Sequence, residues 1–506
     1  MQNPRRGLRN WAEALTLWAM SAPLQTHPLA TRALIEALGS DQVKTDEASC
    51  LAASYDNTRY SFMPEAVVAP KDVDNLQTVV RLANLHKVPI TVRGRGTGNT
   101  GASAPIRGGW VIHLAHWDKI EIDPQSSLAC VEPGAITAKI NESAAVHGLF
   151  FPPDPSSLNY CSIGGNISTN AGGLRAAKYG VVRDFVVALE GVLPTGEFVR
   201  WSAPLRKFVS GYNLRDLWVG AEGTLGIVTK AWIRLVPLPQ ARRTFLFAFE
   251  SDEKALEAAA ALMTSRVAPA VFEFLDTQTT EVAQRRLGEG VFSAAEVQGV
   301  ANPALLLIEL DGHPAVLAED AEKVRAWSKG RTLAQRESDN PAEAEKLWTI
   351  RRTCSQAMYL LGNAKLNEDI VVPFRSYVKL IQLAQRMRKT YGLPTPTFGH
   401  AADGNFHIHV MYNREDKEHC RKAESAIIEM MREVVAMGGA ITGEHGIGIS
   451  KSAFLRLQHT PAEINAMMAI KRALDPNNIL APGQIFEPVN VWEYTPSKVT
   501  FAWDKH

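Results

Sequence analysis

The chain of 506 residues lacks the charge imbalance and the cysteine patterns that mark several functional classes. Its formal net charge is +1, whereas nucleic-acid-binding proteins usually carry a clear basic excess, so we expect no nucleic-acid partner. The five cysteines are scattered, and no two have the CxxC spacing of a zinc or iron–sulfur site. An odd, dispersed set is typical of a reducing compartment, which predicts a cytoplasmic protein.

Long hydrophobic runs are also missing. No stretch approaches the roughly 20 apolar residues that a membrane-spanning helix requires. The apolar piece at residues 11–22 is interrupted by Glu13 and ended by Pro23, and no signal-cleavage pattern follows it. This piece leaves one membrane interaction open, a peripheral contact at the inner face of the membrane.

The remaining composition is that of a globular protein with more than one core. Hydrophobic residues make up 46% and charged residues 21% of a chain that is too long for a single ordinary core. The sequence predicts a helical segment at residues 1–60, a first domain at 61–239, a second at 240–490 and a tail at 491–506. The linker between the two domains is expected at the prolines of residues 237–239.

Apolar periodicity predicts an α+β layout. Helical spacing recurs at residues 29–38, 72–86, 252–263 and 318–329. Strand patterns recur at residues 89–92, 111–114, 128–132, 186–193, 226–235, 244–249 and 305–310. In the second domain, the alternation of strands and helices predicts a sheet covered by helices on one side.

A predicted strand ending at Val92 runs directly into a glycine-rich loop. Glycines let a backbone approach a ligand closely, and successive amide groups can surround an anion, so we predict a diphosphate-binding loop. A mobile glycine hairpin is the alternative. A Rossmann fingerprint is excluded because no helical pattern follows the loop. The predicted binding residues are Arg93, Gly94, Arg95, Gly96, Thr97, Gly98, Asn99 and Thr100.

Histidines and one acidic residue gather in two later segments. His407 and His409 alternate on a predicted strand and so share a face, and His400 precedes them just before a turn at residues 403–405. Glycines flank Glu444 and His445 in the second segment. Two imidazoles and a carboxylate suit Zn²⁺, or Mn²⁺ or Fe²⁺. Spacing alone does not bring residues 400 and 444 together. The alternatives are that the histidines are only structural, or that the His-x-His pair is part of a metallohydrolase site.

Three further segments follow the glycine loop in order, at residues 151–173, 178–184 and 220–229. With residues 93–100, they resemble the flavin-contacting motifs of the vanillyl-alcohol oxidase / p-cresol methylhydroxylase (PCMH) superfamily. This resemblance covers residues 64–240 and implies a two-subdomain, PCMH-type FAD-binding domain. It implies non-covalent FAD, since residues 93–103 contain neither His nor Cys; attachment through Cys161 is the alternative. The further FAD-binding residues that it implies are Pro153, Asp154, Gly164, Gly165, Asn166, Ser168, Asn170, Gly172, Tyr179, Gly180, Glu222, Gly223 and Ile227.

Residues 240–487 resemble the FAD-linked oxidase C-terminal domain of the D-lactate, glycolate and D-2-hydroxyglutarate dehydrogenase family. The resemblance rests on the histidines and the turn at residues 400–407, on the Glu-His-Gly run at 444–446, and on the closing stretch 474–483. It implies a cap domain in which an antiparallel sheet is covered by helices. It also implies that His400, His407 and Glu444 bind a metal and that His445 is the catalytic base. His409 differs from the family members that carry Asn at this position. It could be a fourth ligand, a group that supports a ligand, or a substrate contact.

An arginine anchor for a substrate carboxylate is implied in the same way. Arg351 lies in the segment that resembles the carboxylate-binding segment of the family, and Arg352 is the alternative. A guanidinium group forms two parallel hydrogen bonds with a carboxylate, which suits this task. The bland alternative is a surface ion pair with Glu343 or Glu345 on the same helix.

The function that these resemblances imply is the FAD-dependent oxidation of a D-2-hydroxy acid to the 2-oxo acid. The metal would bind the substrate hydroxyl, His445 would take its proton, and hydride would pass to flavin N5. The expected acceptor of the electrons is a quinone, a cytochrome, an electron-transfer flavoprotein or oxygen, and a homodimer is left open. The alternatives are a non-redox synthase on the same scaffold, such as an ether-lipid synthase, and a flavin subunit of a larger electron-transfer complex.

Overall fold

The computed structural model describes residues 26–491, and the apolar piece at residues 11–22 lies outside them. The first described helix is α2 (Pro28–Leu38), which matches the predicted helix at residues 29–38. Pro28 stands in its first turn, where a missing N–H costs nothing, and Gly39 ends it with a φ of +87°. The predicted helical segment also contains a short strand, β1 (Val43–Lys44), and α3 (Glu47–Ala53).

The first sheet contains three parallel strands, β2 (Ala66–Val68), β4 (Trp110–His113) and β3 (Ile90–Arg93). Strand β1 adds to it in antiparallel fashion, which gives the order β1-β2-β4-β3. Helices α2 and α4 (Val73–His86) pack against this sheet through a shared apolar core. Because parallel strands end at one edge, β3 delivers the glycine loop to the carboxyl edge of this sheet.

The second sheet is antiparallel and has the order β5-β6-β10-β8-β9. Burial alternates along β10, which is the pattern of a strand with one face on a core. A small pair, β7 (Leu149–Phe150) and β11 (Val236–Pro237), lies beside it. The strands are β5 (Ile120–Asp123), β6 (Leu128–Val131), β8 (Val186–Val192), β9 (Phe198–Trp201) and β10 (Ile227–Arg234). The helices of this region are α5 (Thr137–Ala145), α6 (Ile163–Thr169), α7 (Ala176–Tyr179), α8 (Val182–Phe185) and α9 (Leu214–Trp218).

Helix α6 is an element that the sequence pattern did not predict, because its Gly164-Gly165 pair is typical of a turn. Ile163 and Ile167 are four residues apart, and both are buried in the core beneath the second sheet. A Cβ added to Gly164 would lie 2.7 Å from Pro133 Cβ, so glycine allows the helix to reach its neighbour. Tertiary packing therefore outweighs the low helix propensity of glycine here.

The third sheet has seven antiparallel strands in the order β15-β12-β14-β13-β17-β18-β16. Helices α10, α12, α14 and α15 cover one face. The prediction that helices cover only one side was wrong, because α11 and α13 pack on the other face around Leu246, Leu307 and Trp348. The strands are β12 (Ala241–Phe249), β13 (Val271–Leu275), β14 (Ala304–Gly312), β15 (Ala334–Ser338), β16 (Ala364–Val371), β17 (Thr397–His400) and β18 (Asn405–Tyr412). The helices are α10 (Asp252–Met263), α11 (Thr277–Leu287), α12 (Pro314–Ser328), α13 (Pro341–Ala357), α14 (Tyr377–Tyr391) and α15 (Lys417–Ala436).

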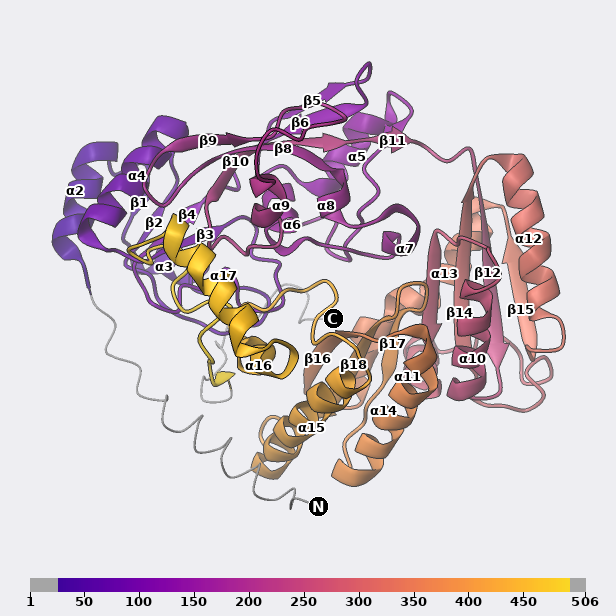
Figure 1. The fold of residues 1–506 in the computed structure, drawn as a ribbon. Coiled ribbons are helices and arrows are strands. Elements are labelled where there is room, and N and C mark those ends of the chain that lie inside the picture. The colour runs from indigo at the N-terminus through magenta and orange to yellow at the C-terminus, as the bar shows by residue number, and fades with distance from the viewer. Residues whose placement is uncertain (1–25, 492–506) are drawn as a thin grey trace.

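The end of the chain returns to the first domain. After α16 (Leu455–Gln458), helix α17 (Pro461–Leu474) lies along the first domain in Figure 1, and Lys471 Nζ donates to Thr224 O of that domain at 2.9 Å. The Ile90 amide donates to Ile479 O at 2.7 Å, and the Ala481 amide donates to Ile90 O at 2.7 Å. Ile479 and Leu480 are members of the core of the first sheet. Residues near 480 therefore complete a domain that begins more than 400 positions earlier.

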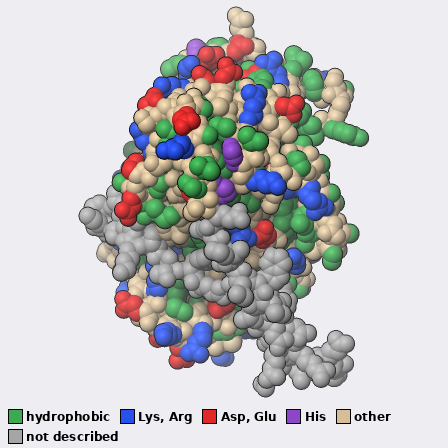
Figure 2. Space-filling model, turned by 90° about the vertical axis from the view of Figure 1, so that its left-hand side faces the viewer, with side chains coloured by type: hydrophobic (Ala, Val, Ile, Leu, Met, Phe, Trp, Pro, Cys, Tyr) green, Lys and Arg blue, Asp and Glu red, His purple; other side chains and the backbone are tan. Residues whose placement is uncertain are grey.

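The described surface is mixed in charge. On the face that carries α2, basic and acidic side chains are interspersed in Figure 2, as the small net charge leads one to expect. Within residues 26–491, none of the helices combines the length and the apolar character needed to cross a membrane.

The contact of Gly164 with Pro133 can be tested against its neighbour Gly165. We expect Gly164→Ala to lower the melting temperature, because forcing a methyl group into a packed site costs about 1–3 kcal/mol. Gly165→Ala should be neutral or slightly stabilising, since the nearest atom to its added Cβ is Ser162 Oγ at 3.7 Å. Thermal melting of both variants beside the parent protein makes the measurement. Equal melting temperatures for the two variants would show that the Pro133 contact is unimportant.

Candidate active site

A pocket lies at the carboxyl edge of the first sheet, between that sheet and the second. Three segments of the first domain line it, near residues 92–103, 155–171 and 222–228, and the C-terminal domain adds Glu444 and His445. It therefore joins the diphosphate-type loop to the predicted catalytic base. Predicted FAD-binding residues that line the pocket are Arg93, Gly94, Arg95, Gly96, Thr97, Gly98, Asn99, Gly164, Gly165, Asn166, Ser168, Glu222, Gly223 and Ile227.

The glycine loop is supported from beneath by Arg93. Its guanidinium group donates to Tyr55 O at 2.5 Å and lies beside the buried Asp56. Gly96 has a φ of +67°, and a Cβ at this position would collide with the Arg93 guanidinium group at 2.2 Å. The loop can pass over this side chain only because residue 96 is glycine. Arg93 thus has a structural partner, while Arg95 is exposed at the pocket.

The other predicted FAD-binding residues lie outside this lining. Thr100 accepts hydrogen bonds at its carbonyl oxygen from the amides of Ile449 and Ser450, at 2.8 and 3.0 Å. Asp154 pairs with Arg175, and the Tyr179 hydroxyl donates to the Asp311 carboxylate at 2.9 Å across the domain boundary. Asn170, in the left-handed conformation, ends α6. Pro153, Gly172 and Gly180 are the remaining residues of this group.

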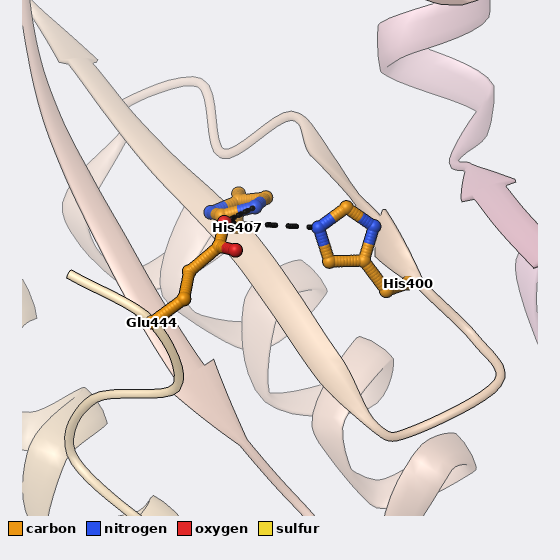
Figure 3. A group of neighbouring side chains, drawn as sticks. All are labelled: His400, His407 and Glu444. Atoms are coloured by element: carbon orange, nitrogen blue, oxygen red, sulfur yellow. Dashed lines mark ion pairs between the residues drawn. The ribbon is translucent and has the colours of Figure 1, made fainter. Parts of the chain in front are cut away.

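Figure 3 shows His400, His407 and Glu444 pointing toward one another from three different elements. His400 ends β17, His407 lies on β18, and Glu444 lies in the loop after α15. The Nε2 atoms of His400 and His407 are 3.7 and 3.6 Å from Glu444 Oε1. Their ligand atoms all lie within 4.8 Å of one another. The structure thus brings together the residues that spacing alone could not connect.

These three residues fit a divalent cation by their chemistry. A tetrahedral site with bonds of about 2.0–2.2 Å needs ligand atoms about 3.3–3.6 Å apart. The two histidine–glutamate separations, 3.7 and 3.6 Å, are close to this range. Burial lowers the pKa of His407 to about 3, so its imidazole is neutral as a metal ligand must be. Burial would also lower the pKa of His400, but the Glu273 and Glu444 carboxylates outweigh burial and raise it well above its ordinary value, so a cation that bound here would displace a proton from His400. His400 Nδ1 is bonded to the Glu273 carboxylate at 2.5 Å, which directs Nε2 toward Glu444. A carboxylate behind a histidine ligand is a frequent arrangement in metal sites.

Glu273 is a functional candidate that the sequence analysis missed. Its second oxygen accepts a hydrogen bond from Arg351 Nε at 2.5 Å, so one carboxylate links Arg351 to His400. Burial would raise the pKa of Glu273, but the charges of His400 and Arg351 outweigh burial and lower it to about 2. The available signal was a single acidic residue within the apolar strand 271–275, where it is fully buried.

Arg351, rather than Arg352, faces this site. The Arg351 side chain is 15% exposed, and its guanidinium carbon lies 4.5 Å from the centre of the Phe398 ring. Arg352 is on the outer side of α13, where it pairs with Glu345 at the surface. The surface ion pair with Glu345 that was the alternative role for Arg351 is therefore made by Arg352.

Asp369 organises the loop that carries Glu444 and His445. Its Oδ2 accepts hydrogen bonds from the amides of Gly443, Glu444 and His445 at 2.9, 3.0 and 3.0 Å. Burial would raise the pKa of Asp369, but His445, Lys451 and His407 outweigh it and hold the pKa well below the usual range. No sequence pattern predicted the contact between Asp369 and the loop at residues 443–445.

The imidazole of His445 lies between the two domains. Asn99 Nδ2 is 3.2 Å from His445 Nε2, and Asn57 Nδ2 donates to Asn99 Oδ1 at 2.6 Å. An amide nitrogen only donates, so this orientation leaves the lone pair of His445 on Nε2. The other ring nitrogen, Nδ1, is 3.8 Å from Asp369 Oδ2. The arrangement gives His445 the tautomer of a base whose lone pair faces the pocket.

His409 is separate from the three predicted metal ligands. Its ring stacks on Phe398 with a centroid distance of 4.9 Å, and it is fully buried. Burial lowers its pKa well below the ordinary value, so it is neutral. The geometry places His409 beside the Arg351–Phe398 contact and does not add it to the group of ligand atoms within 4.8 Å.

The pocket also fits a flavin nucleotide. Glycines at its wall are positions where a side chain would enter occupied space; a Cβ at Gly94, for example, would lie 2.3 Å from Ser162 Oγ. The glycine loop at the carboxyl edge of a parallel sheet is a setting in which backbone amides bind phosphate groups. The buried Cys161 is within 3.5 Å of Thr137 Oγ1 and does not line the pocket.

Comparisons with known proteins agree with this architecture. A family model described as an FAD binding domain matches residues 64–202, and one described as FAD linked oxidases, C-terminal domain, matches residues 238–485. Among similar proteins is glycolate oxidase subunit GlcD of Bacillus subtilis, 38% identical over 90% of this chain and 96% of its own. Another is D-lactate dehydrogenase of Anaerostipes hadrus, 31% identical over 88% of this chain and 94% of its own.

A solved structure shares the fold. The p-cresol methylhydroxylase structure superposes with a TM-score of 0.75 at 21% identity, over 92% of this chain and 97% of that one. The predicted resemblance and the predicted PCMH-type architecture with its C-terminal domain are both confirmed. The chain belongs to the family of FAD-linked oxidoreductases in which an FAD-binding domain precedes an FAD-linked oxidase C-terminal domain.

Proposed function

We propose that this protein oxidises a D-2-hydroxy acid, of the D-lactate, glycolate or D-2-hydroxyglutarate type, to the corresponding 2-oxo acid. The observation that carries the proposal is that Glu444 and His445 line the flavin pocket and that Glu444 also closes the group with His400 and His407. The proposed base, the proposed metal ligands and the pocket that fits FAD are therefore adjacent. The names of the relatives, a glycolate oxidase subunit and a D-lactate dehydrogenase, support the same substrate class.

We propose that His400, His407 and Glu444 hold a divalent cation, with zinc as the expected ion and manganese or iron as alternatives. Two imidazoles and one carboxylate leave open positions, as catalytic sites require. When bound, such a cation lowers the pKa of a coordinated hydroxyl group. Glu273 holds the His400 ring in the orientation that this role needs, through the 2.5 Å contact with Nδ1.

In this proposal His445 is the catalytic base. Its Nε2 lone pair faces Asn99, and a substrate hydroxyl that took the place of this amide would find an acceptor already oriented. The carboxylate of Asp369, 3.8 Å from Nδ1, favours the positive charge that the ring gains when it accepts the proton. FAD, when bound, accepts the hydride from Cα.

Arg351 is the proposed anchor of the substrate carboxylate. It is partly buried beside His400, and their shared partner Glu273 fixes it through Nε, which leaves the terminal nitrogens of the fork for a ligand. Holding the carboxylate determines which face of Cα is presented to the flavin. His409 and Lys365 lie on neighbouring strands of the same face and are candidates for contacts with the rest of the substrate.

The remaining expectations stay predictions. These are a cytoplasmic location, a homodimer, and transfer of the electrons to a quinone, a cytochrome or an electron-transfer flavoprotein. A non-redox synthase and a flavin subunit without its own substrate are the competing functions. Both differ from the proposal in one measurable respect, since neither predicts that a hydroxy acid alone reduces the flavin.

Anaerobic mixing of the FAD-loaded protein with D- and L-2-hydroxy acids tests the proposal. We expect a D-acid, or glycolate, to bleach the visible flavin band. Prior treatment with a chelator should suppress this bleaching, and zinc or manganese should restore it. Metal analysis of protein purified without a histidine tag provides the control. Reduction by none of the acids would refute the proposed activity, and bleaching unaffected by complete metal removal would refute the role of the cation.

Replacing His445 with alanine tests the base. Removal of a general base slows its step by about 100- to 10,000-fold, so flavin reduction by the substrate should nearly cease while FAD stays bound. His147→Ala is the matched control, because His147 is exposed and outside the pocket. Stopped-flow absorbance makes the measurement. Fast bleaching in His445→Ala would mean that another group takes the proton.

The adjacent arginines offer a matched pair for the carboxylate anchor. Arg351→Lys keeps the charge but loses the fork, so we expect the apparent second-order rate of flavin reduction to fall about 10- to 100-fold, as for the loss of a charge-assisted hydrogen bond. Arg352→Lys should change this rate less than about twofold, because the side chain pairs at the surface. Equal effects in the two variants would remove Arg351 from the proposed mechanism.

A further inference from the structure

The loop at residues 442–448 is held from both sides by buried carboxylates. On one side, Asp369 of its own domain accepts the amides of residues 443–445. On the other side, Glu222 of the FAD-binding domain accepts the Ile447 amide through Oε1 at 2.8 Å and the Gly448 amide through Oε2 at 2.7 Å. The first contact shapes the loop within the C-terminal domain. The second crosses the domain boundary and links the loop to the wall of the flavin pocket.

We propose that Glu222 is a positioning residue that fixes the His445 loop against the flavin pocket. This inference rests on the proposed function, because it assigns to Glu222 the placement of the proposed base. It also changes the role that the sequence implied for this residue. Both carboxylate oxygens are engaged by loop amides, so the side chain is committed to the opposite domain, although its residue lines the pocket that fits FAD.

The backbone at Glu222 is itself constrained in a way that aims the carboxylate. Glu222 has a φ of +52°, in the left-handed region that side chains other than those of Asn and Asp seldom adopt. Its amide donates to Ser168 O of α6 at 2.8 Å, and the residue is 6% exposed. A conformation of this kind persists only where the surroundings determine it. Here α6, which borders the pocket, determines it.

The loop is shaped to receive this carboxylate. Gly446 has a φ of +86°, and a Cβ at that position would lie 2.9 Å from Glu222 Oε1. A side chain at residue 446 would therefore displace the Glu222 carboxylate, and it would also have to adopt a φ that residues other than glycine seldom adopt. Glycine lets the backbone come close enough for the next two amides to donate to the carboxylate.

The two hydrogen bonds from the loop amides offset the cost of burying the Glu222 carboxylate. Burial raises the pKa of Glu222 to about 7, and the Ile447 and Gly448 amides are the groups that oppose this rise. An unpaired buried carboxylate is costly, so opening the loop away from Glu222 is resisted. The ionised form of Glu222, which both amides favour, therefore holds the loop in place.

A second set of hydrogen bonds also links the FAD-binding domain to this loop of the C-terminal domain. Thr100, at the end of the glycine loop, accepts the Ile449 and Ser450 amides and donates from Oγ1 to His445 O at 3.3 Å. Residues on both sides of residue 446 are thus hydrogen-bonded to segments that border the flavin pocket. Reaction geometry tolerates little displacement, since a misplacement of about 1 Å can slow a reaction by about 100-fold.

Glu222→Gln is the sharpest variant for testing this role. Glutamine has the same shape, but only its oxygen accepts, so its NH₂ group would face one of the two loop amides as a second donor. Glu190→Gln is the matched control. Glu190 is a 7% exposed carboxylate of the same domain that pairs with Arg200 and does not line the pocket. Both substitutions replace one buried carboxyl group with an amide, but only the first touches the loop.

The experiment compares the full-length, FAD-loaded parent protein with both variants. Hydrogen exchange of the peptide that covers residues 443–450 reports loop order without any substrate. Stopped-flow reduction by the best acid of the panel gives the rate at saturation and the apparent dissociation constant. For Glu222→Gln we expect loop exchange to accelerate about 10-fold, as for the loss of one hydrogen bond. We expect the saturated rate to fall about 10- to 100-fold, with FAD content and melting temperature within the range of Glu190→Gln.

The outcomes are distinguishable. Parental loop exchange and a parental saturated rate in Glu222→Gln would overturn the proposal. Loss of FAD, with an unchanged rate per bound flavin, would overturn it in favour of a cofactor-binding role. Melting far below that of Glu190→Gln, with both readouts unchanged at lower temperature, would overturn it in favour of a purely structural role. If no acid reduces the parent protein, the proposed function fails, and loop exchange alone decides whether Glu222 positions the loop.

Discussion

Side chains in a β-strand alternate between the two faces of the sheet, and in the seven-stranded sheet this alternation separates stability from chemistry. On β18, Phe406, Ile408 and Val410 enter the apolar core under α14 and α15. His407 and His409 point the other way, toward the first domain and α13. Glu273 on β13, His400 on β17 and Asp369 on β16 have the same parity as these histidines through the pairing of their strands. A shift of one residue in any of these strands would exchange core and site.

Around the candidate site, ordering is achieved by buried carboxylates rather than by apolar packing. Glu273, Asp369 and Glu222 are each at most 6% exposed, and each binds two or more donors. A carboxylate accepts several hydrogen bonds at short range, so a single side chain can fix a ring, a guanidinium group or a run of amides. Such groups are costly to bury without partners, which gives the site a strong preference for one arrangement.

The sequence predicted the parts of this protein that depend on local pattern. The glycine loop at 93–101, the strand at 406–410 and helix α4 follow from spacing, and family resemblance connected Glu444 to the two histidines. Helix α6 was missed because packing against Pro133 outweighs the turn preference of its glycines. The roles of Glu273, Asp369 and Glu222 were missed because the partners of these carboxylates are far away in the sequence. His400 is 127 positions from Glu273, Gly443 is 74 from Asp369, and Ile447 is 225 from Glu222. Contacts between residues so far apart produce no periodic pattern in the sequence.

The return of residues 479–481 to strand β3 has a consequence for how this protein is made. The core of the first sheet includes Ile479 and Leu480, so the N-terminal domain lacks part of its interior until residues 479–481 have left the ribosome. Lys471 Nζ, buried beside Thr224 O and Leu480 O, adds polar contacts that form only at that stage. Chain synthesis therefore places the completion of the flavin-binding half after that of the half that carries the histidines. A chain that ended before residue 479 would leave the first domain unfinished, which ties cofactor acquisition to the synthesis of this late segment.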